Sequence, residues 1–326
     1  MPERLAASWL ALSLILGVPV PAAADPAVQA GRSVGWITLG TKGGPVPNAV
    51  RSEPANLLIA GDKPWLVDCG DGAMERLAAA GYKPTDIDVV LISHLHIDHI
   101  GGLQGLVGLR WMMGAEKTLT IYGPPGTQAL VDGLLASLAP SQAIARYEAM
   151  RGGDPARLVR VVTLVGGARF VRDGIVVRAA RNSHFDQPPG HPLVNGSQSL
   201  SYRFDTPTRS ITFTGDTGPS AAVVALARGS DLLVSEVMDM DRTREVYAAK
   251  TDMSPARKAQ MLMHLADQHL SPQAAGRLAG EAHVKALVFT HLGLFDPVEK
   301  VAARLVAEAH EIYPGPVTVA RDLDRF

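Results

Sequence analysis

The segment Ser93–Gly102 constrains this chain more than any other, because it places three histidines and an aspartate within six positions. The string reads S-H-L-H-I-D-H-I-G-G and directly follows an apolar run, V-V-L-I. An extended strand points residues two apart to the same side, so His94 and His96 are expected to face one space. The chain then turns, and Asp98 and His99 are expected to point back into that space. Imidazole and carboxylate groups bind zinc and neighbouring divalent metals, so the segment predicts a metal site.

The rest of the chain alternates short apolar strands with amphipathic helices. β-branched runs bounded by Gly, Asp or Pro alternate with segments of 3.6-residue periodicity that begin at capping residues. With 326 residues, of which 47% are hydrophobic, the chain has enough apolar side chains for a large core. The stretch Ser141–Arg157, rich in Ala, Gly and Arg, is expected to be a surface excursion rather than a linker. We therefore expect one domain over residues 33–326, with two packed sheets and helices outside.

The first residues have the order of a secretory signal peptide. Arg4 is followed by the apolar run Trp9–Val18, which is too short to span a bilayer comfortably. Prolines end this run, and Ala22–Ala24 offers a cleavage site of small residues before Asp25. We expect residues 1–24 to be removed and the mature protein to be periplasmic or secreted, with no membrane span. A retained anchor and a wrongly assigned start are the alternatives.

The pattern H-x-H-x-D-H after an apolar strand resembles the signature of the metallo-β-lactamase superfamily. Four further segments are similar to those of its ribonuclease Z and arylsulfatase-like branch, namely Leu39–Thr41, Gly43–Pro45, Leu66–Gly72 and Tyr122–Pro124. The resemblance covers nearly all of the chain after the expected cleavage site. It implies an α/β fold, a four-layer αββα sandwich in which two mixed sheets pack together, helices cover the outer faces and metals lie at one edge.

Further ligands are expected where later apolar strands end. His184 follows such a strand, whereas His191 lies a few residues on, among prolines and a glycine. A strand end positions a ligand more rigidly than a loop, so His184 is preferred and His191 remains the rival. Asp216, in T-G-D-T, has two oxygens with which to bridge two cations, and its alternative role is to cap the next helix. His291 ends another strand, and its alternative is a core or surface histidine.

The resemblance sorts these residues into two metal sites. The implied ligands are His94, His96 and His184 for one metal, Asp98, His99 and His291 for the other, and Asp216 for both. Two metals about 3.5–4 Å apart can lower the pKa of a shared solvent molecule and hold both the attacking and the leaving oxygen. We therefore expect two divalent ions, Zn2+ with Mn2+ or Fe as alternatives, and a bridging hydroxide as the nucleophile.

Two further residues are expected to join Asp98 in the chemistry. His269, in Q-H-L-S, precedes a predicted helix, and the resemblance implies that it is not a ligand but stabilises the transition state or protonates the leaving group. Glu236 ends a strand where related chains often have a His-Glu pair, and Ser235 replaces that histidine here. We expect Glu236 to orient His269 by accepting its second N–H. A helix-start histidine and an exposed carboxylate are the alternatives.

The metals define the reaction type and say little about the substrate. Ribonuclease Z, in the branch that this chain resembles, carries a basic arm that grips tRNA. Here the stretch after Pro125 has no lysine cluster and mixes both signs: Arg146, Arg151, Arg157 and Arg160 with Asp132, Glu148 and Asp154. The formal net charge of -1 also gives no reason to expect a polyanionic partner. We expect a small anionic ester, a phosphodiester or an aryl sulfate ester, and not nucleic acid.

Other functions on the same fold remain alternatives. A lactonase would use the same ligand set. A β-lactamase usually has a cysteine ligand or lacks the bridging aspartate, and this chain has Asp216 there. A ribonuclease Z-like tRNA endonuclease is a third alternative. A diiron oxidoreductase would have a glutamate at the position of His96 and a flavin domain, and a metal-binding protein without catalysis would be expected to have lost ligands. A homodimer is compatible with the sequence.

Overall fold

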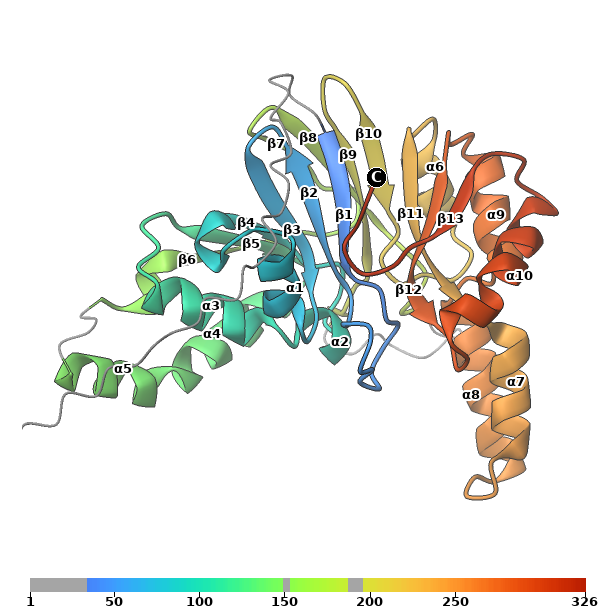
Figure 1. The fold of residues 1–326 in the computed structure, drawn as a ribbon, viewed down its shortest axis with the longest axis horizontal. Helices are drawn as coiled ribbons and strands as arrows, with labels where there is room; N and C mark the ends of the chain where they lie inside the picture. Colours follow the sequence, from blue (N-terminus) through green and yellow to red (C-terminus); the bar gives the residue numbers. More distant parts are fainter. Residues whose placement is uncertain (1–33, 149–152, 187–195) are drawn as a thin grey trace, which may run out of the picture. The chain divides into compact units, whose positions relative to one another are not determined.

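Two seven-stranded β-sheets form the centre of the structure, a computed structural model that describes residues 34–148, 153–186 and 196–326. The predicted signal peptide and His191 lie outside these ranges. Within them, no helix is long and apolar enough to cross a membrane. The two sheets pack face to face and helices cover their outer faces (Figure 1), so the four-layer αββα sandwich that the resemblance implied is confirmed.

The first sheet has the strand order β14-β1-β2-β3-β4-β5-β6. Its strands are β1 Val34–Gly40, β2 Ala55–Ala60, β3 Lys63–Cys69, β4 Val89–Leu91, β5 Leu119–Gly123, β6 Val159–Thr163 and β14 Asp324–Arg325. Strands β14, β1, β2 and β3 pair antiparallel, whereas β3 to β6 pair parallel. The parallel half is reached through helical crossovers, as parallel pairing requires.

The second sheet has the order β13-β12-β11-β10-β9-β8-β7 and the same division into two halves. Its strands are β7 Arg169–Arg172, β8 Ile175–Arg181, β9 Leu200–Asp205, β10 Ser210–Phe213, β11 Leu232–Met238, β12 Leu287–Gly293 and β13 Val317–Val319. Strands β7 to β10 pair antiparallel and β10 to β13 pair parallel. In each sheet, the C-terminal ends of several parallel strands therefore lie together at one edge of the sandwich.

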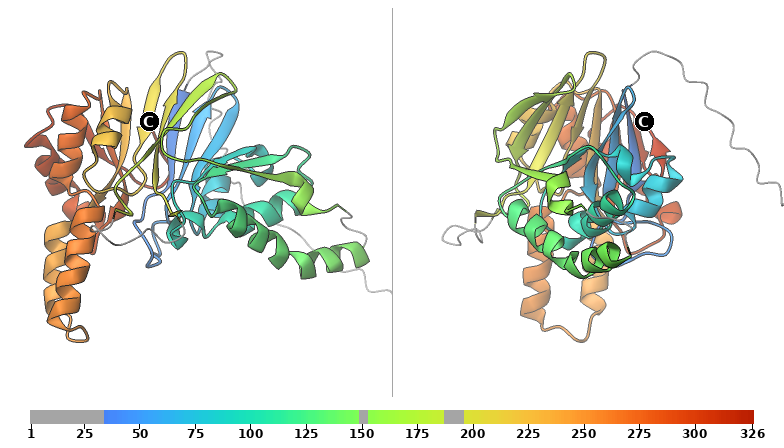
Figure 2. Two further views of the ribbon diagram at one scale, coloured as in Figure 1. Left: turned by 180° about the vertical axis from the view of Figure 1, so that it is seen from behind. Right: turned by 90° about the vertical axis from the view of Figure 1, so that its left-hand side faces the viewer.

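The helices fall into two groups (Figure 2). Those of the first group lie in the sequence among the strands of the first sheet, and those of the second group among the strands of the second sheet. The first group is α1 Ala73–Ala79, α2 Ile97–Ile100, α3 Leu103–Met112, α4 Thr127–Ser137 and α5 Ala139–Tyr147, with short 3-10 turns at Pro84–Asp86 and Pro155–Leu158. The second is α6 Ala221–Ala227, α7 Met240–Ala249, α8 Pro255–Gln268, α9 Pro272–Glu281 and α10 Val298–His310. Helices α7 and α8 pack on each other and project from the second sheet (Figures 1 and 2).

Three apolar clusters hold these layers together. Between the sheets, Trp36 packs its ring 5.7 Å from that of Phe213 and 6.0 Å from that of Phe204. A second cluster joins the first sheet to α1, α3 and α4, and a third joins the other sheet to α6, α9 and α10. Because both faces of the central strands are covered, β3 is buried from Pro64 to Cys69. This burial makes the sheets a rigid support for the residues at their edges.

The structure contains elements that the sequence patterns did not predict. The surface excursion expected at Ser141–Arg157 includes most of helix α5, which begins at Ala139. Helix α7 was missed because M-D-R-T-R-E-V-Y-A-A has no clear apolar stripe. Its start is capped by the Asp239 side chain, which accepts from the Arg242 amide at 3.1 Å, and α8 packs along it. Tertiary packing thus makes a helix where local periodicity is weak.

Candidate metal centre

All of the residues predicted to bind metal and described by the structure meet at one edge of the sandwich. The chain leaves β4 through Ser93 and His94, and His96, still extended, is the N-cap of the one-turn helix α2. That helix carries Asp98 and His99, both buried. The short helix therefore turns the chain back toward the edge, as the H-x-H-x-D-H pattern predicted.

The remaining predicted residues arrive from the second sheet. His184 follows β8 and Asp216 follows β10, whereas His291 lies within β12, near its C-terminal end. His291 has a φ of 42°, a left-handed conformation that is costly for a residue with a Cβ. The strand pairing of β11 with β12 shifts register at this point, so the backbone departs from regular pleating where the imidazole turns to the edge.

Three histidines form the first cluster of candidate ligand atoms. His96 Nδ1 lies 3.1 Å from His94 Nε2 and 3.1 Å from His184 Nε2. Atoms bound to one tetrahedral zinc at ~2.0–2.1 Å are about 3.4 Å apart. The three nitrogens are therefore spaced as ligands of one metal would be. Burial lowers the pKa of His94 and lowers that of His184 to about 3, so both imidazoles are neutral and able to donate a lone pair.

A second cluster combines two histidines with two carboxylates. Asp98 Oδ2 lies 3.6 Å from His99 Nε2 and 3.4 Å from His291 Nε2. Asp216 Oδ1 lies 3.4 Å from His99 Nε2, and its Oδ2 lies 3.1 Å from His291 Nε2. These separations match those of the first cluster, so the second group is also shaped for one cation.

Asp216 belongs to both clusters. Besides its contacts in the second, its Oδ2 lies 3.9 Å from His94 Nε2 and 3.9 Å from His184 Nε2. The carboxylate is buried and stands between the two sets of imidazoles. This is the position that a carboxylate bridging two cations would occupy.

Several buried atoms of this centre fit a bound cation. Among the described residues, His99 Nε2, Asp216 Oδ1 and His291 Nε2 have no hydrogen-bond partner although each is fully buried. Buried polar atoms without partners are rare and costly, and a metal would satisfy all three. Burial lowers the pKa of His291, but Asp216 and Asp98 outweigh it and raise the pKa to about 10. The carboxylates therefore create a negative potential suited to divalent cations.

A buried network behind the ligands holds two imidazoles in place. Asp68 Oδ2 accepts from His99 Nδ1 at 2.8 Å and from Ser93 Oγ at 2.8 Å, and Ser93 Oγ lies 3.0 Å from His94 Nδ1. Because the Nδ1 atoms are engaged here, the Nε2 lone pairs of His94 and His99 point to the centre. The sequence analysis included Asp68 only as a member of the segment Leu66–Gly72, without a role of its own. Its φ of 57° shows that the backbone also departs from β geometry there.

The third imidazole of the first cluster is positioned by the end of α8. His184 Nδ1 donates to the Gln268 carbonyl at 3.0 Å. Phe185, the next residue, packs its ring 5.6 Å from the ring of His94 and 5.1 Å from that of His96. The sequence analysis did not single out Phe185 or Gln268. Phe185 shields this side of the histidine cluster with an apolar surface.

His269 and Glu236 form a buried pair beside both clusters. His269 Nδ1 donates to Glu236 Oε2 at 2.7 Å, and Glu236 Oε1 accepts from the Thr217 amide at 2.5 Å. The expected contact between these two side chains is thus present in the structure. One ring nitrogen of His269 also lies within 4.8 Å of a candidate ligand atom of His184 and of Asp216. Because its Nδ1 is engaged by Glu236, the free Nε2 is the atom available toward the centre.

The loop after β1 packs directly against the second cluster. A Cβ added to Gly44 would lie 1.8 Å from Asp98 Oδ2, and one added to Gly43 would lie 3.1 Å from His291 Nδ1. Only glycine can bring the backbone this close to the two side chains. These glycines belong to the segment Gly43–Pro45, whose resemblance to the family was noted in the sequence.

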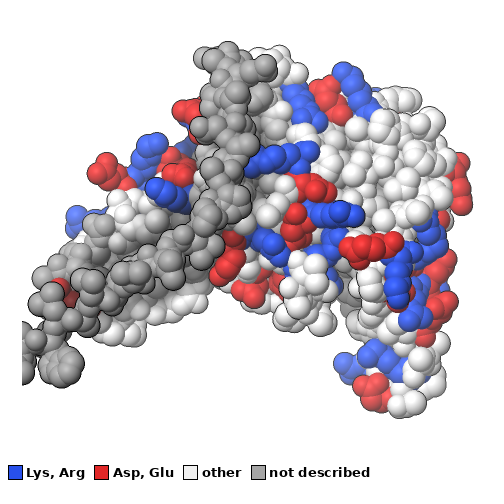
Figure 3. Space-filling view, viewed as in Figure 1, with Lys and Arg blue, Asp and Glu red and all other residues white. Residues whose placement is uncertain are grey.

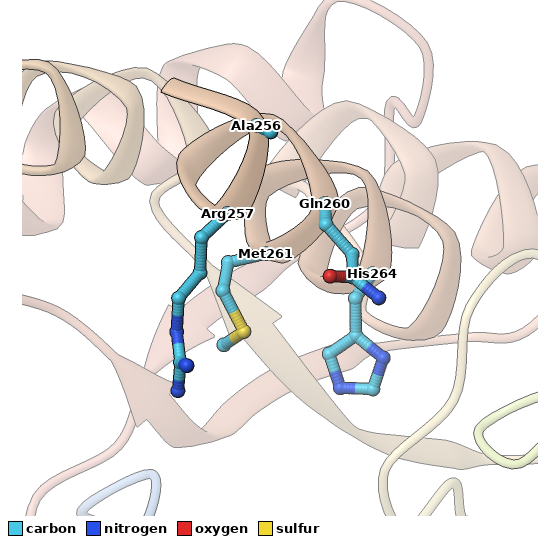
Figure 4. A pocket seen from close by; sticks show the side chains of 5 residues that line it. All are labelled: Ala256, Arg257, Gln260, Met261 and His264. Carbon is cyan, nitrogen blue, oxygen red and sulfur yellow. The ribbon is translucent and has the colours of Figure 1, made fainter. Parts of the chain in front are cut away.

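A groove runs along α8 outside the histidine clusters. It is lined by Ala256, Arg257, Gln260, Met261 and His264 (Figure 4). His264 belongs to none of the candidate metal groups among the described residues, and burial lowers its pKa. The helix continues from this groove to His269, its C-cap, which is buried beside the candidate centre.

Comparison with known proteins agrees with this fold and places the chain in a known family. A family model described as a "Beta-lactamase superfamily domain" matches residues 65–292. Curated relatives named Ribonuclease Z include those of Mycobacterium sp. (strain KMS), 31% identical over 294 residues, and of Mycobacterium bovis (strain BCG / Pasteur 1173P2), 30% identical over 295 residues. The alignments cover 89% of this chain and 94% and 96% of the two relatives.

Solved structures show the same architecture at lower identity. The metallo-beta-lactamase fold protein YhfI from Bacillus subtilis superposes with a TM-score of 0.62 at 20% identity, covering 90% of this chain and 99% of that one. The short form of human tRNase Z gives a TM-score of 0.60 at 22% identity, covering 90% and 98%. At such identities the likeness concerns the fold.

Proposed function

This chain is a member of the β-lactamase superfamily and of its ribonuclease Z branch, a metal-dependent hydrolase of ester bonds, and we propose that it cleaves a small anionic ester at a centre of two zinc ions. The ester is a phosphodiester or an aryl sulfate. The observation that carries the proposal is the position of Asp216 between two clusters of ligand atoms. The buried atoms without a partner, His99 Nε2, Asp216 Oδ1 and His291 Nε2, support the second site. The three imidazole nitrogens of the first cluster, spaced as ligands of one metal would be, support the other.

In this proposal the two sites take the ligands expected from the sequence. One ion is held by His94, His96 and His184, the other by Asp98, His99 and His291, and Asp216 contacts both. Two divalent cations, when bound, would polarise the ester and lower the pKa of a water molecule toward neutrality. Zinc suits this mixture of imidazole and carboxylate, with manganese and iron as the alternatives.

His269 and Glu236 are proposed to handle the proton of the leaving group. Burial lowers the pKa of His269, but the Glu236 carboxylate outweighs it and raises the pKa above the ordinary value. The protonated imidazole is thus favoured, with its Nδ1–H directed to Glu236 and its Nε2–H left to donate. A donor so placed can protonate the oxygen that leaves as the ester breaks. Asp98 contributes as a ligand of the second cluster, where its Oδ2 lies 3.6 Å from His99 Nε2 and 3.4 Å from His291 Nε2.

RNA is the second candidate substrate, because relatives of about the same length are named Ribonuclease Z. The charge pattern on one face of the described residues does not support it. On the face seen in Figure 3, acidic and basic side chains alternate over the described residues and no continuous basic stripe forms. A surface that contacts a phosphate backbone is expected to be visibly basic. We therefore favour the small ester.

A substrate panel tests the proposal. Protein purified without chelators is assayed with bis(4-nitrophenyl) phosphate, a 4-nitrophenyl sulfate, a lactone, a penicillin and a precursor tRNA with a 3′ trailer. We expect turnover of the diester or the sulfate that chelation abolishes and zinc restores. Cleavage of the precursor tRNA at a far higher kcat/KM would replace the small ester by RNA, and activity confined to the lactone or the penicillin would overturn the proposed ester class.

We also propose that the protein is exported and acts outside the cytoplasm. The support is the order of a basic residue, an apolar run and Ala22–Ala24 at the start of the chain. Intact mass of protein from the native host is expected to correspond to a chain that begins at or near Asp25. A cytosolic protein that retains residues 1–24 would contradict the proposal.

A further inference from the structure

Lys42 is a cationic side chain on the loop that contacts the metal centre. It follows β1 and pairs with Leu292, the residue after His291, in an isolated parallel bridge. The next amide, that of Gly43, donates to the Leu292 carbonyl at 3.1 Å. Since Gly43 and Gly44 pack against His291 and Asp98, the chain that carries Lys42 runs along two of the proposed ligands.

The ammonium group of Lys42 is half-buried and has donors left over. It bonds to the Gly43 carbonyl and takes part in none of the ion pairs among the described residues. Its electrostatic partners are Glu53 and Asp98, which offset part of the lowering of its pKa by burial. An ammonium has three donors, so a charge held here without a close carboxylate is suited to an incoming anion.

The other cation of this loop is already engaged. Arg51 Nη1 donates to Thr41 Oγ1 at 2.6 Å and to the Ala320 carbonyl at 3.1 Å, which ties the loop to the end of the chain. Asp322 compensates the charge of Arg51 and binds Thr41 as well. Arg51 therefore acts as a structural clamp, and Lys42 is left as the cation of this loop whose charge interacts with the proposed ligand Asp98.

The charge balance of the centre gives Lys42 a role. Two divalent cations and a protonated His269 would bring five positive charges, and the buried carboxylates around them bring five negative ones: Glu53, Asp68, Asp98, Asp216 and Glu236. The filled centre would then have little net charge with which to attract an anion. A nearby ammonium would supply that attraction, because a charge in a partly dehydrated position interacts more strongly than one in water.

We propose that Lys42 binds an anionic oxygen of the ester at the metal centre and so selects phosphate or sulfate esters over neutral ones. This inference rests on the proposed function and names what sets its substrate class. Lys42 is a binding residue in this scheme and has no part in proton transfer. Lys42 lies in the loop sequence G-T-K-G-G-P.

The first test compares two esters with the same leaving group. Lys42→Met removes the charge and keeps the length of the side chain, Lys42→Arg keeps the charge, and Lys63→Met is the matched control, since Lys63 is exposed and pairs with Asp173. We expect Lys42→Met to lose about 10- to 100-fold in kcat/KM for bis(4-nitrophenyl) phosphate, the range for losing a hydrogen bond to a charged group. For neutral 4-nitrophenyl acetate the loss should stay below about 3-fold, and Lys42→Arg should recover most of the diester activity.

A second test does not depend on turnover. Binding of inorganic phosphate to the zinc-loaded protein is measured by calorimetry, with metal content checked for each variant. Lys42→Met should weaken phosphate binding by a factor similar to its kinetic loss, while Lys63→Met binds as the wild type does. If the wild type hydrolyses neither ester, the proposed function fails and phosphate binding still decides the role of Lys42. Unchanged phosphate binding in Lys42→Met, or equal losses on both esters, would overturn the inference.

Discussion

His269 Nδ1 lies 2.7 Å from Glu236 Oε2, and this contact joins two residues that are 33 positions apart in the chain. Both side chains are buried, His269 at the end of α8 and Glu236 on β11. The carboxylate fixes the tautomer and the orientation of the imidazole, which leaves Nε2 directed away from it. The pair thus separates proton handling from metal binding within one crowded edge of the fold.

Replacing His269 is expected to slow catalysis without removing metal. His269→Ala should lose about 10²- to 10⁴-fold in kcat, as the loss of a positioned acid typically does. The loss should be smallest for nitrophenyl esters, whose leaving group needs little protonation, and largest for diesters with an alkyl alcohol as leaving group. Steady-state kinetics on both kinds of substrate, with elemental analysis of the protein, measures this.

His264→Ala is the matched control for this variant. His264 lies on the same helix and lines the groove on α8, outside the candidate metal groups of the described residues. It should retain near wild-type rates on both substrates. Loss of a metal from His269→Ala would mean that His269 is a ligand, and unchanged rates on the alkyl diester would mean that it is not the acid.

Glu236→Gln is expected to move the pH dependence of the rate. The Glu236 carboxylate raises the pKa of His269, so the donor form persists to a higher pH and is lost as the pH rises through that raised value. Glutamine still accepts from Nδ1 but carries no charge, so the pKa of His269 should fall. The alkaline limb of kcat for an alkyl diester should therefore shift to lower pH. An alkaline limb at the same pH in both proteins would refute this role for Glu236.

Metal content is expected to depend on Asp216 more than on any single histidine. Purified wild-type protein should hold two divalent ions per chain, as the two ligand clusters imply. Asp216→Ala should lose both. Asp68→Asn should bind metal with ~10- to 100-fold lower affinity, because only the orientation of His99 and, through Ser93, that of His94 are disturbed. Asp132→Asn is the control, because Asp132 is an exposed residue of α4. Mass spectrometry for metals checks each, and one ion per wild-type chain would contradict the bridging role of Asp216.

Gly44→Ala is expected to disturb the second metal site through backbone packing alone. The added methyl would lie 1.8 Å from Asp98 Oδ2, so either the loop or the carboxylate has to move. We expect lower metal affinity with a nearly unchanged melting temperature for the metal-free protein. Gly133→Ala in α4 meets no atom within 4 Å and should leave metal binding intact. Equal metal affinity in both variants would show that the loop is not held against Asp98.

The local pattern of the chain carries much of the candidate site. His94, His96, Asp98 and His99 could be predicted because a strand end and a short turn bring neighbours in sequence to one space. His184 and Asp216 could be predicted because each follows an apolar strand. The sandwich itself followed from the resemblance and from the alternation of strands and helices. By contrast, α7 escaped prediction because packing on α8 stabilises it.

The sequence by itself therefore determined the type of fold and the chemical identity of the groups at its edge. Only the tertiary structure decided how most of these groups are supported: Asp68 behind His99, Gly44 against Asp98, and Lys42 next to the segment that carries His291. Each of these contacts joins residues far apart in the chain, and no spacing or periodicity specifies such a pair. They arise because two rigid sheets pack at one angle and register, which brings together loops that the chain itself keeps apart.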